Sequence, residues 1–126
     1  MLLCDIYYET LEHLFANCML VKTFWLQLLE IWNVFKGSAF LICNKDIFLG
    51  FDLLDSSQTC ALNLLMLYGK RYIVKCRFEK SYMDIQVFLK YFQSHYAFRV
   101  NAHIVCNLKA YEIELTEFCF HYHVNW

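Results

Sequence analysis

The chain has 126 residues, of which 60% are hydrophobic and 19% aromatic, and its formal net charge is −1 at pH 7. This length supports one domain with a single core, and the near-neutral charge excludes polyanion binding through overall electrostatics. A membrane span is also excluded, because Lys70 and Arg71 end the longest apolar run well before the ~18 residues that a span needs. The apolar share exceeds the ~45–50% of ordinary soluble domains, which indicates surface that a partner or a neighbouring domain covers.

The seven cysteines are odd in number and show no disulfide framework. The first residues lack the basic region and the small-residue cleavage site of a secretory signal. Both observations predict an intracellular protein, cytoplasmic or nuclear, whose thiols are free or bound to metal.

The first 25 residues contain three candidate zinc ligands, Cys4, His13 and Cys18. Apolar residues at positions 11, 14, 15 and 18 follow helical spacing and predict a short helix that carries His13. Thr10 is the expected cap of this helix, and Cys18 falls at its end. Two thiolates and an imidazole in this arrangement can converge on one tetrahedral Zn²⁺, but a structural site normally has four ligands, so this one is incomplete.

The next helix is predicted by an apolar stripe that ends at Gly37, with Lys36 in the last turn. The stripe consists of Val21, Phe24, Trp25, Leu28, Trp32 and Phe35. Its two tryptophans could serve as a base-stacking platform, but tryptophans at helical spacing are far more often core residues, and we assign them to the core.

Residues 38–60 are less regular. Residues 40–43 form a short apolar segment that is expected to be buried, and periodicity does not decide between strand and helix there. Asn44 is the expected cap of a brief helix that Gly50 ends. Cys43 is a candidate fourth zinc ligand, although a lone cysteine more often acts as a small core residue. Residues 55–59 read as a linker that also caps the following helix.

A long helix is predicted over 57–78, with Gly69 allowing close approach of a neighbouring element. Its buried face consists of Leu62, Leu65, Met66, Tyr72, Ile73 and Cys76. A basic band lies opposite this face and consists of Lys70, Arg71, Lys75, Arg77 and Lys80. Residues 70–99 carry seven basic and two acidic side chains, so this is the basic part of the chain. The band either neutralises phosphates or is a solvated helix face, which most such charge runs are.

Ser81 and Asp84 have the form of a capping box for a further helix, with Ser81 as the cap. An apolar stripe from position 85 to 96 and a second one from 104 to 118 follow. A single helix over both would be unusually long, so a break is expected near residues 97–101. The absence of proline supports a mainly helical chain.

The C-terminus carries Cys119, His121 and His123, which would share one face of a strand and could then hold a metal. In a helix, residues two apart do not face each other, and the preceding helical pattern favours that alternative. No glycine-rich phosphate loop, nucleophile elbow or His-Glu-x-x-His pair occurs in the sequence. The chain is therefore not expected to be an enzyme or to bind a small-molecule substrate.

The N-terminal motif resembles the zinc-binding module that follows the reverse transcriptase domain in LINE-type (non-LTR) retrotransposon polyproteins. That family's pattern runs Cys, two or three residues, Cys, then His, then Cys and an aromatic helix. Here it is matched by Cys4, residues 9–15, Cys18 and Phe24-Trp25, while Met1 stands where the leading Cys is expected. Residues 46–50 and 64–77 also resemble the family's C-terminal tail. The resemblance implies zinc-supported binding of RNA or DNA, and a chain that begins inside the motif.

The predicted fold is mainly α: a small irregular helical domain with a degenerate N-terminal zinc-knuckle-like motif. Residues 1–36 hold this motif and the aromatic helix, and residues 37–126 form a helical tail of the same structural unit. The expected function is that of a truncated, non-catalytic, nucleic-acid-binding tail of a retrotransposon polyprotein. One alternative is a helical module whose apolar surface docks on a protein partner, and another is a relic reading frame with no selected function.

Overall fold

The structure is a computed structural model that describes residues 10, 12–51, 57–102 and 109–121, without the side chains of residues 97–102, 120 and 121. The described residues form six helices and no strand, which confirms the mainly α fold. The helices are η1 (His13–Asn17), α1 (Met19–Lys36), α2 (Asn44–Leu49), α3 (Ser57–Glu79), α4 (Ile85–Ala102) and α5 (Ala110–His121). Within these ranges, no helix combines the length and apolar character that a membrane crossing requires.

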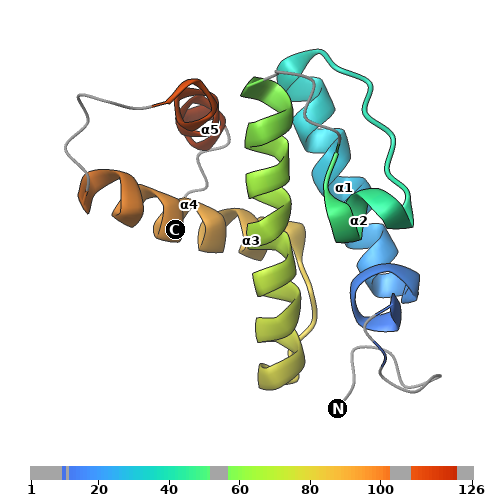
Figure 1. The fold of residues 1–126 in the computed structure, drawn as a ribbon. Coiled ribbons are helices and arrows are strands. Elements are labelled where there is room, and N and C mark those ends of the chain that lie inside the picture. Colours follow the sequence, from blue (N-terminus) through green and yellow to red (C-terminus); the bar gives the residue numbers. More distant parts are fainter. Residues whose placement is uncertain (1–9, 11, 52–56, 103–108, 122–126) are drawn as a thin grey trace.

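Helix α3 stands at the centre of the arrangement (Figure 1). Helices η1, α1 and α2 lie on one side of it, α5 lies on the other, and α4 runs across it. Contacts between elements agree with this view, because α3 packs against α5, α4 and η1, while α1 packs against η1 and α4. The helices cross at steep angles and do not form an up-and-down bundle, which fits the irregular helical domain that the sequence predicts.

The core is dominated by aromatic side chains that α1, α3, α4 and α5 contribute. Trp25 and Trp32 are 1% and 0% exposed, so both tryptophans are core residues, as the stripe on α1 predicts. The ring of Phe24 lies 5.2 Å from that of Phe88 in an edge-to-face pair, and Trp32 lies 5.5 Å from Phe118. Pairs of this geometry stabilise by roughly 0.5–1.5 kcal/mol beyond the area that they bury.

Gly69 allows α1 to pack directly against α3. A Cβ atom at this position would lie 2.8 Å from the nearest ring carbon of Trp25, closer than real Cβ contacts. The indole ring of Trp25 therefore occupies the space that any larger residue at position 69 would need, and the predicted role of Gly69 is confirmed.

The ends of α1 and α2 match most of the predicted signals. Gly37 ends α1 in the left-handed region with φ of 63°, and Lys36 lies in the last turn. Gly50 ends α2, but the cap at its start is Cys43, not Asn44. The predicted cap is one residue late because the carboxylate of Asp46 accepts the Cys43 N–H at 3.0 Å and so closes the first turn around Cys43.

The segment between α1 and α2 is irregular and largely exposed, which corrects the prediction of a buried segment. Leu41 is 86% exposed and Cys43 is also exposed, whereas Phe40 and Ile42 are half-buried. The side-chain amide of Asn33 binds both backbone groups of Phe40. Its Oδ1 accepts the Phe40 N–H at 3.0 Å, and its Nδ2 donates to the Phe40 carbonyl at 2.9 Å.

Asn63 of α3 repeats this arrangement at the end of α2. Its Oδ1 accepts the Phe51 N–H at 2.7 Å, and its Nδ2 donates to the Phe51 carbonyl at 3.0 Å. The rings of Phe40 and Phe51 meet edge to face at 5.2 Å. Two helix-borne amides thus satisfy backbone groups of the two phenylalanines, which explains how an irregular segment packs without a β-ladder.

Helix α4 begins at Ile85, and its cap is Asp84. The Asp84 Oδ1 atom accepts the backbone N–H groups of Gln86 at 2.8 Å and Val87 at 3.3 Å. The prediction of Ser81 as the cap is wrong, because α4 begins only at Ile85, whereas Ser81 lies just after α3 and its N–H donates to the Cys76 carbonyl at 3.0 Å. The helix also continues through residues 97–101, where the sequence predicts a break, and α5 is a separate helix that begins at Ala110.

Candidate nucleic-acid interface

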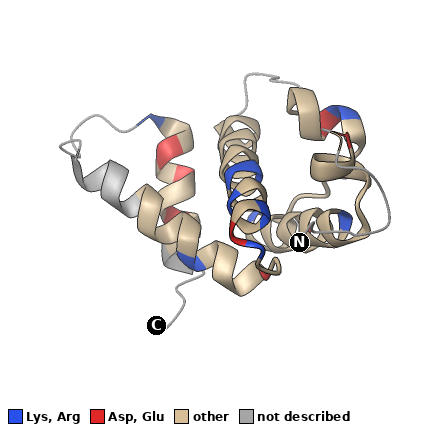
Figure 2. Cartoon of the chain, turned by 90° about the horizontal axis from the view of Figure 1, so that it is seen from below, with Lys and Arg blue, Asp and Glu red and all other residues tan. Residues whose placement is uncertain are grey.

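The basic band lies on the side of α3 opposite its buried face. Lys70, Arg71, Lys75 and Arg77 belong to α3, and Lys80 follows its last residue. Figure 2 shows these basic positions gathered along α3, whereas the acidic positions of α5 lie on a separate helix. A local positive field can therefore form here even though the net charge of the whole chain is −1.

Three of the five basic residues line one open groove of about 520 Å³. Its walls come from three elements: Lys70, Arg71, Val74 and Lys75 of α3, Tyr91 and His95 of α4, and Phe15 of η1. The groove thus combines cations, two planar polar rings and an apolar floor. Phosphates and nucleobases are the ligands that this combination suits, since cations pair with phosphate and rings stack on bases.

The three cations of the groove have different environments. Burial lowers the pKa of Lys70 from its ordinary value, whereas the neighbouring Glu79 raises that of Lys75. The Lys75 ammonium lies 2.8 Å from a Glu79 carboxylate oxygen in an exposed pair. The Arg71 guanidinium lies 6.0 Å from the centre of the Tyr68 ring. Arg71 is therefore the exposed cation of the groove that is best placed to bind phosphate, because Lys75 would first have to break its ion pair with Glu79.

Arg77 and Lys80 are not among the residues that line the groove. Arg77 is half-buried one turn beyond the groove, and Lys80 is exposed with a left-handed φ of 55° at the end of α3. These two residues extend the positive surface along the helix but do not share the groove with the other three. The sequence correctly predicts that the band, apart from Lys80, lies on one helix, but the groove depends on how α4 and η1 pack against that helix.

The groove also contains a pair of rings, Tyr91 and His95, that the sequence analysis does not single out. The His95 ring centre lies 4.3 Å from that of Tyr91, and His95 Nδ1 lies 2.8 Å from the Tyr91 carbonyl oxygen. The Tyr91 ring is in turn 5.7 Å from that of Tyr72 in the core. The spacing of four residues between Tyr91 and His95 was the available signal, since such residues are neighbours on a helix.

Two of the three candidate zinc ligands lie in the described part of the chain. His13 begins η1 and Cys18 ends it, and both side chains are buried, at 7% and 1% exposure. The Thr10 Oγ1 atom accepts the His13 N–H at 3.0 Å, the bond predicted for a capping hydroxyl, whereas the residue that directly precedes η1 is Glu12. Cys4 lies outside the described residues. Within those residues, no three side chains of the kinds that bind metal come together.

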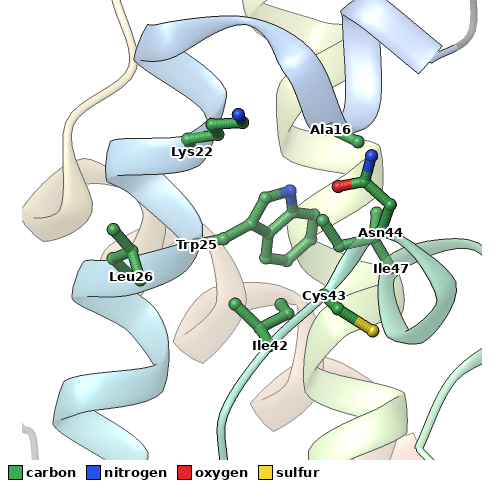
Figure 3. A pocket seen from close by; sticks show the side chains of 8 residues that line it. All are labelled: Ala16, Lys22, Trp25, Leu26, Ile42, Cys43, Asn44 and Ile47. Atoms are coloured by element: carbon green, nitrogen blue, oxygen red, sulfur yellow. The ribbon is translucent and has the colours of Figure 1, made fainter.

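Cys43, the candidate fourth ligand, borders a hollow of about 240 Å³ beside Trp25 (Figure 3). Its sulfur points away from the Trp25 ring, and its thiol is 3.2 Å from an Asp46 carboxylate oxygen. The neighbouring Asn44 Nδ2 donates to Asn17 Oδ1 at 3.0 Å, which ties α2 to the end of η1. The hollow is mainly apolar and offers no cluster of ionisable groups.

At the C-terminus, α5 is helical through His121, so Cys119 and His121 are two residues apart on a helix and do not share a face. His123 lies outside the described residues. Burial raises the pKa of the Cys119 thiol to about 12, which disfavours the thiolate that would bind a metal. The helical alternative considered for this segment is therefore the one observed.

Comparison with models of protein families, with curated proteins and with solved structures finds no match to this chain. A function has to be inferred from the groove and from the N-terminal motif themselves.

Proposed function

We propose that the chain is a non-catalytic nucleic-acid-binding module that holds the sugar–phosphate backbone of RNA in the groove between α3, α4 and η1. The observation that carries this proposal is that Lys70, Arg71 and Lys75 line the same groove as Tyr91 and His95. The resemblance of Cys4, His13 and Cys18 to a retrotransposon zinc-binding module supports it independently. In this proposal the module derives from the tail of such a polyprotein, and η1 links the zinc motif to the groove through Phe15.

Binding of this kind depends on release of the counterions that surround the nucleic acid. Each phosphate that a cation neutralises contributes a slope of about −0.7 to a plot of log affinity against log salt for single strands. Three groove cations therefore predict a slope of about −2. The Lys70 ammonium, which burial already desolvates, gains an anionic neighbour when a phosphate enters the groove.

The proposal is tested by fluorescence anisotropy with a labelled single-stranded RNA at several salt concentrations. Arg71→Ala should weaken binding and reduce the magnitude of the salt slope by about 0.7, because one phosphate contact is lost. Lys45→Ala is the matched control, since it removes the same charge from an exposed position on α2, which does not line the groove. Binding that ignores salt, or that responds equally to both variants, would reject the groove as the site.

A protein-interaction module is the second candidate, and exposed apolar residues on α1 favour it. Met19, Leu26 and Val34 are exposed, and their spacing of seven and eight residues places them on one side of the helix. Sedimentation velocity distinguishes the candidates: association that rises with concentration in a chain without RNA affinity would support this second function and contradict the first.

A further inference from the structure

A short column of rings, tilted against one another by 46° and 38°, leads from the core to solvent; it consists of Tyr72, Tyr91 and His95, and the last two line the groove. Tyr72 is buried, Tyr91 is half-buried 5.7 Å from it, and His95 is exposed with its ring centre 4.3 Å from that of Tyr91. The contact between His95 Nδ1 and the Tyr91 carbonyl holds the imidazole over the tyrosine. The His95 ring is therefore oriented in advance, and its side chain is exposed to solvent.

From this column we infer that the groove selects single-stranded over duplex nucleic acid by stacking an unpaired base on His95. The inference rests on the proposed function and adds the form of nucleic acid that is bound. A base within a duplex has both faces covered by its neighbours, so only an unpaired base can extend the column. Arg71 and Lys75, on the opposite wall of the groove, are then available for the phosphates that flank this base.

A second exposed ring lies on the same side of α3 as these cations. Phe78 is 81% exposed, and it follows Arg71 by seven residues and Lys75 by three, which places the three side chains on one helix face. An aromatic ring beside cations on an open surface is typical of single-strand binding, where successive bases stack on successive rings. A nucleic-acid strand bound in the groove can therefore continue along α3 and stack a further base on Phe78.

The experiment compares three labelled probes of equal length: a single-stranded RNA of mixed sequence, its duplex, and a strand that carries the same phosphates but abasic sugars. Affinities are measured by anisotropy at one salt concentration. The single strand should bind more tightly than the abasic strand by between about 5-fold and about 100-fold, the range for stacking of one base. The duplex should bind less tightly than the single strand, because its bases cannot stack on His95.

Two variants link this preference to the rings. His95→Ala should weaken binding of the single strand and leave binding of the abasic strand unchanged, while His95→Phe, which keeps a ring, should retain the preference. Phe78→Ala should act in the same direction as His95→Ala, and both residues are exposed, so neither truncation removes a buried side chain. Gln86→Ala, at an exposed position on α4, is the control that should change nothing.

The outcomes separate this inference from the proposed function. Equal affinity for the single strand, the duplex and the abasic strand, with a salt slope intact, would overturn base stacking and leave phosphate binding in place. A loss of single-strand preference in Gln86→Ala, or its survival in both His95→Ala and Phe78→Ala, would also overturn it. If no probe binds, the proposed function and this inference fail together.

Discussion

Single residues decide how closely the elements of this chain approach one another. At Gly69 the missing side chain lets the Trp25 ring lie against the backbone of α3. At Asn33 and Asn63 one amide group satisfies both backbone groups of a phenylalanine in an irregular segment. Glycine as a site of close approach could be predicted from its place on a helix face. The asparagine pairings could not, because they join residues that no periodicity connects.

Gly69→Ala should destabilise the chain. The added Cβ would lie 2.8 Å from the Trp25 ring and force α1 and α3 apart, which typically costs about 1–3 kcal/mol, against a gain of about 1 kcal/mol in helix propensity. Urea unfolding followed by circular dichroism measures the net loss. Gly37→Ala is the comparison, because a Cβ there meets nothing within 4 Å and only the left-handed backbone is strained. A Gly69→Ala chain that is more stable than the wild type by about 1 kcal/mol, the full gain in helix propensity, would contradict the close packing.

The helices themselves follow from their apolar stripes, whereas their ends were harder to predict. The stripe on α1 predicts its buried face, and Gly37 predicts its end. The sequence predicts Asn44 and Ser81 as the caps of α2 and α4, but Cys43 and Asp84 hold those positions. Several neighbouring polar side chains compete for the same free N–H groups at a helix start, and the direction in which the chain enters the helix decides among them.

The two competing caps of α4 can be separated by substitution. Asp84→Ala should lower the free energy of unfolding by about 1 kcal/mol, because the N–H groups of Gln86 and Val87 lose their acceptor. Ser81→Ala should change it by less than about 0.5 kcal/mol, since the structural role of Ser81 is carried by its backbone N–H. Denaturant titrations of both variants measure the difference. A larger loss of unfolding free energy in Ser81→Ala than in Asp84→Ala would indicate that Ser81 is the cap of α4.

At the scale of the whole molecule, the basic band was predictable and the groove was not. The positions of Lys70, Arg71 and Lys75 on one helix face follow from their spacing, but the rings opposite them come from α4 and η1. Bringing these elements together depends on tertiary packing around α3, which a single sequence does not specify by pattern alone. The candidate zinc ligands at the N-terminus are predicted from their spacing alone, and one of them, Cys4, lies outside the described residues.

Zinc should stabilise the chain strongly only when the motif has four ligands. In the pattern that the N-terminus resembles, a cysteine stands where this chain has Met1, so Met1→Cys behind an added start residue should complete the site. Zinc at 100 times its dissociation constant then adds about 2.7 kcal/mol, seen as a rise in melting temperature. The unaltered chain should respond much less, and Cys4→Ser in the restored chain should abolish the gain. An equal response of all three proteins to zinc and chelator would refute the missing-ligand argument.

The position of Trp25 makes it an intrinsic fluorophore between the two regions to which functions are assigned. Its indole N–H donates to the carbonyl of Phe15 at 2.8 Å, and Phe15 belongs to the short helix between His13 and Cys18 and also lines the basic groove. Binding of a metal to the motif, or entry of a base into the groove, should change the geometry of this hydrogen bond and with it the environment of the indole ring. In a chain with Trp32→Phe and Trp126→Phe, which leaves Trp25 as the single tryptophan, its emission should change in both events. Quenching by one ligand in the presence of the other would reveal whether the two regions communicate.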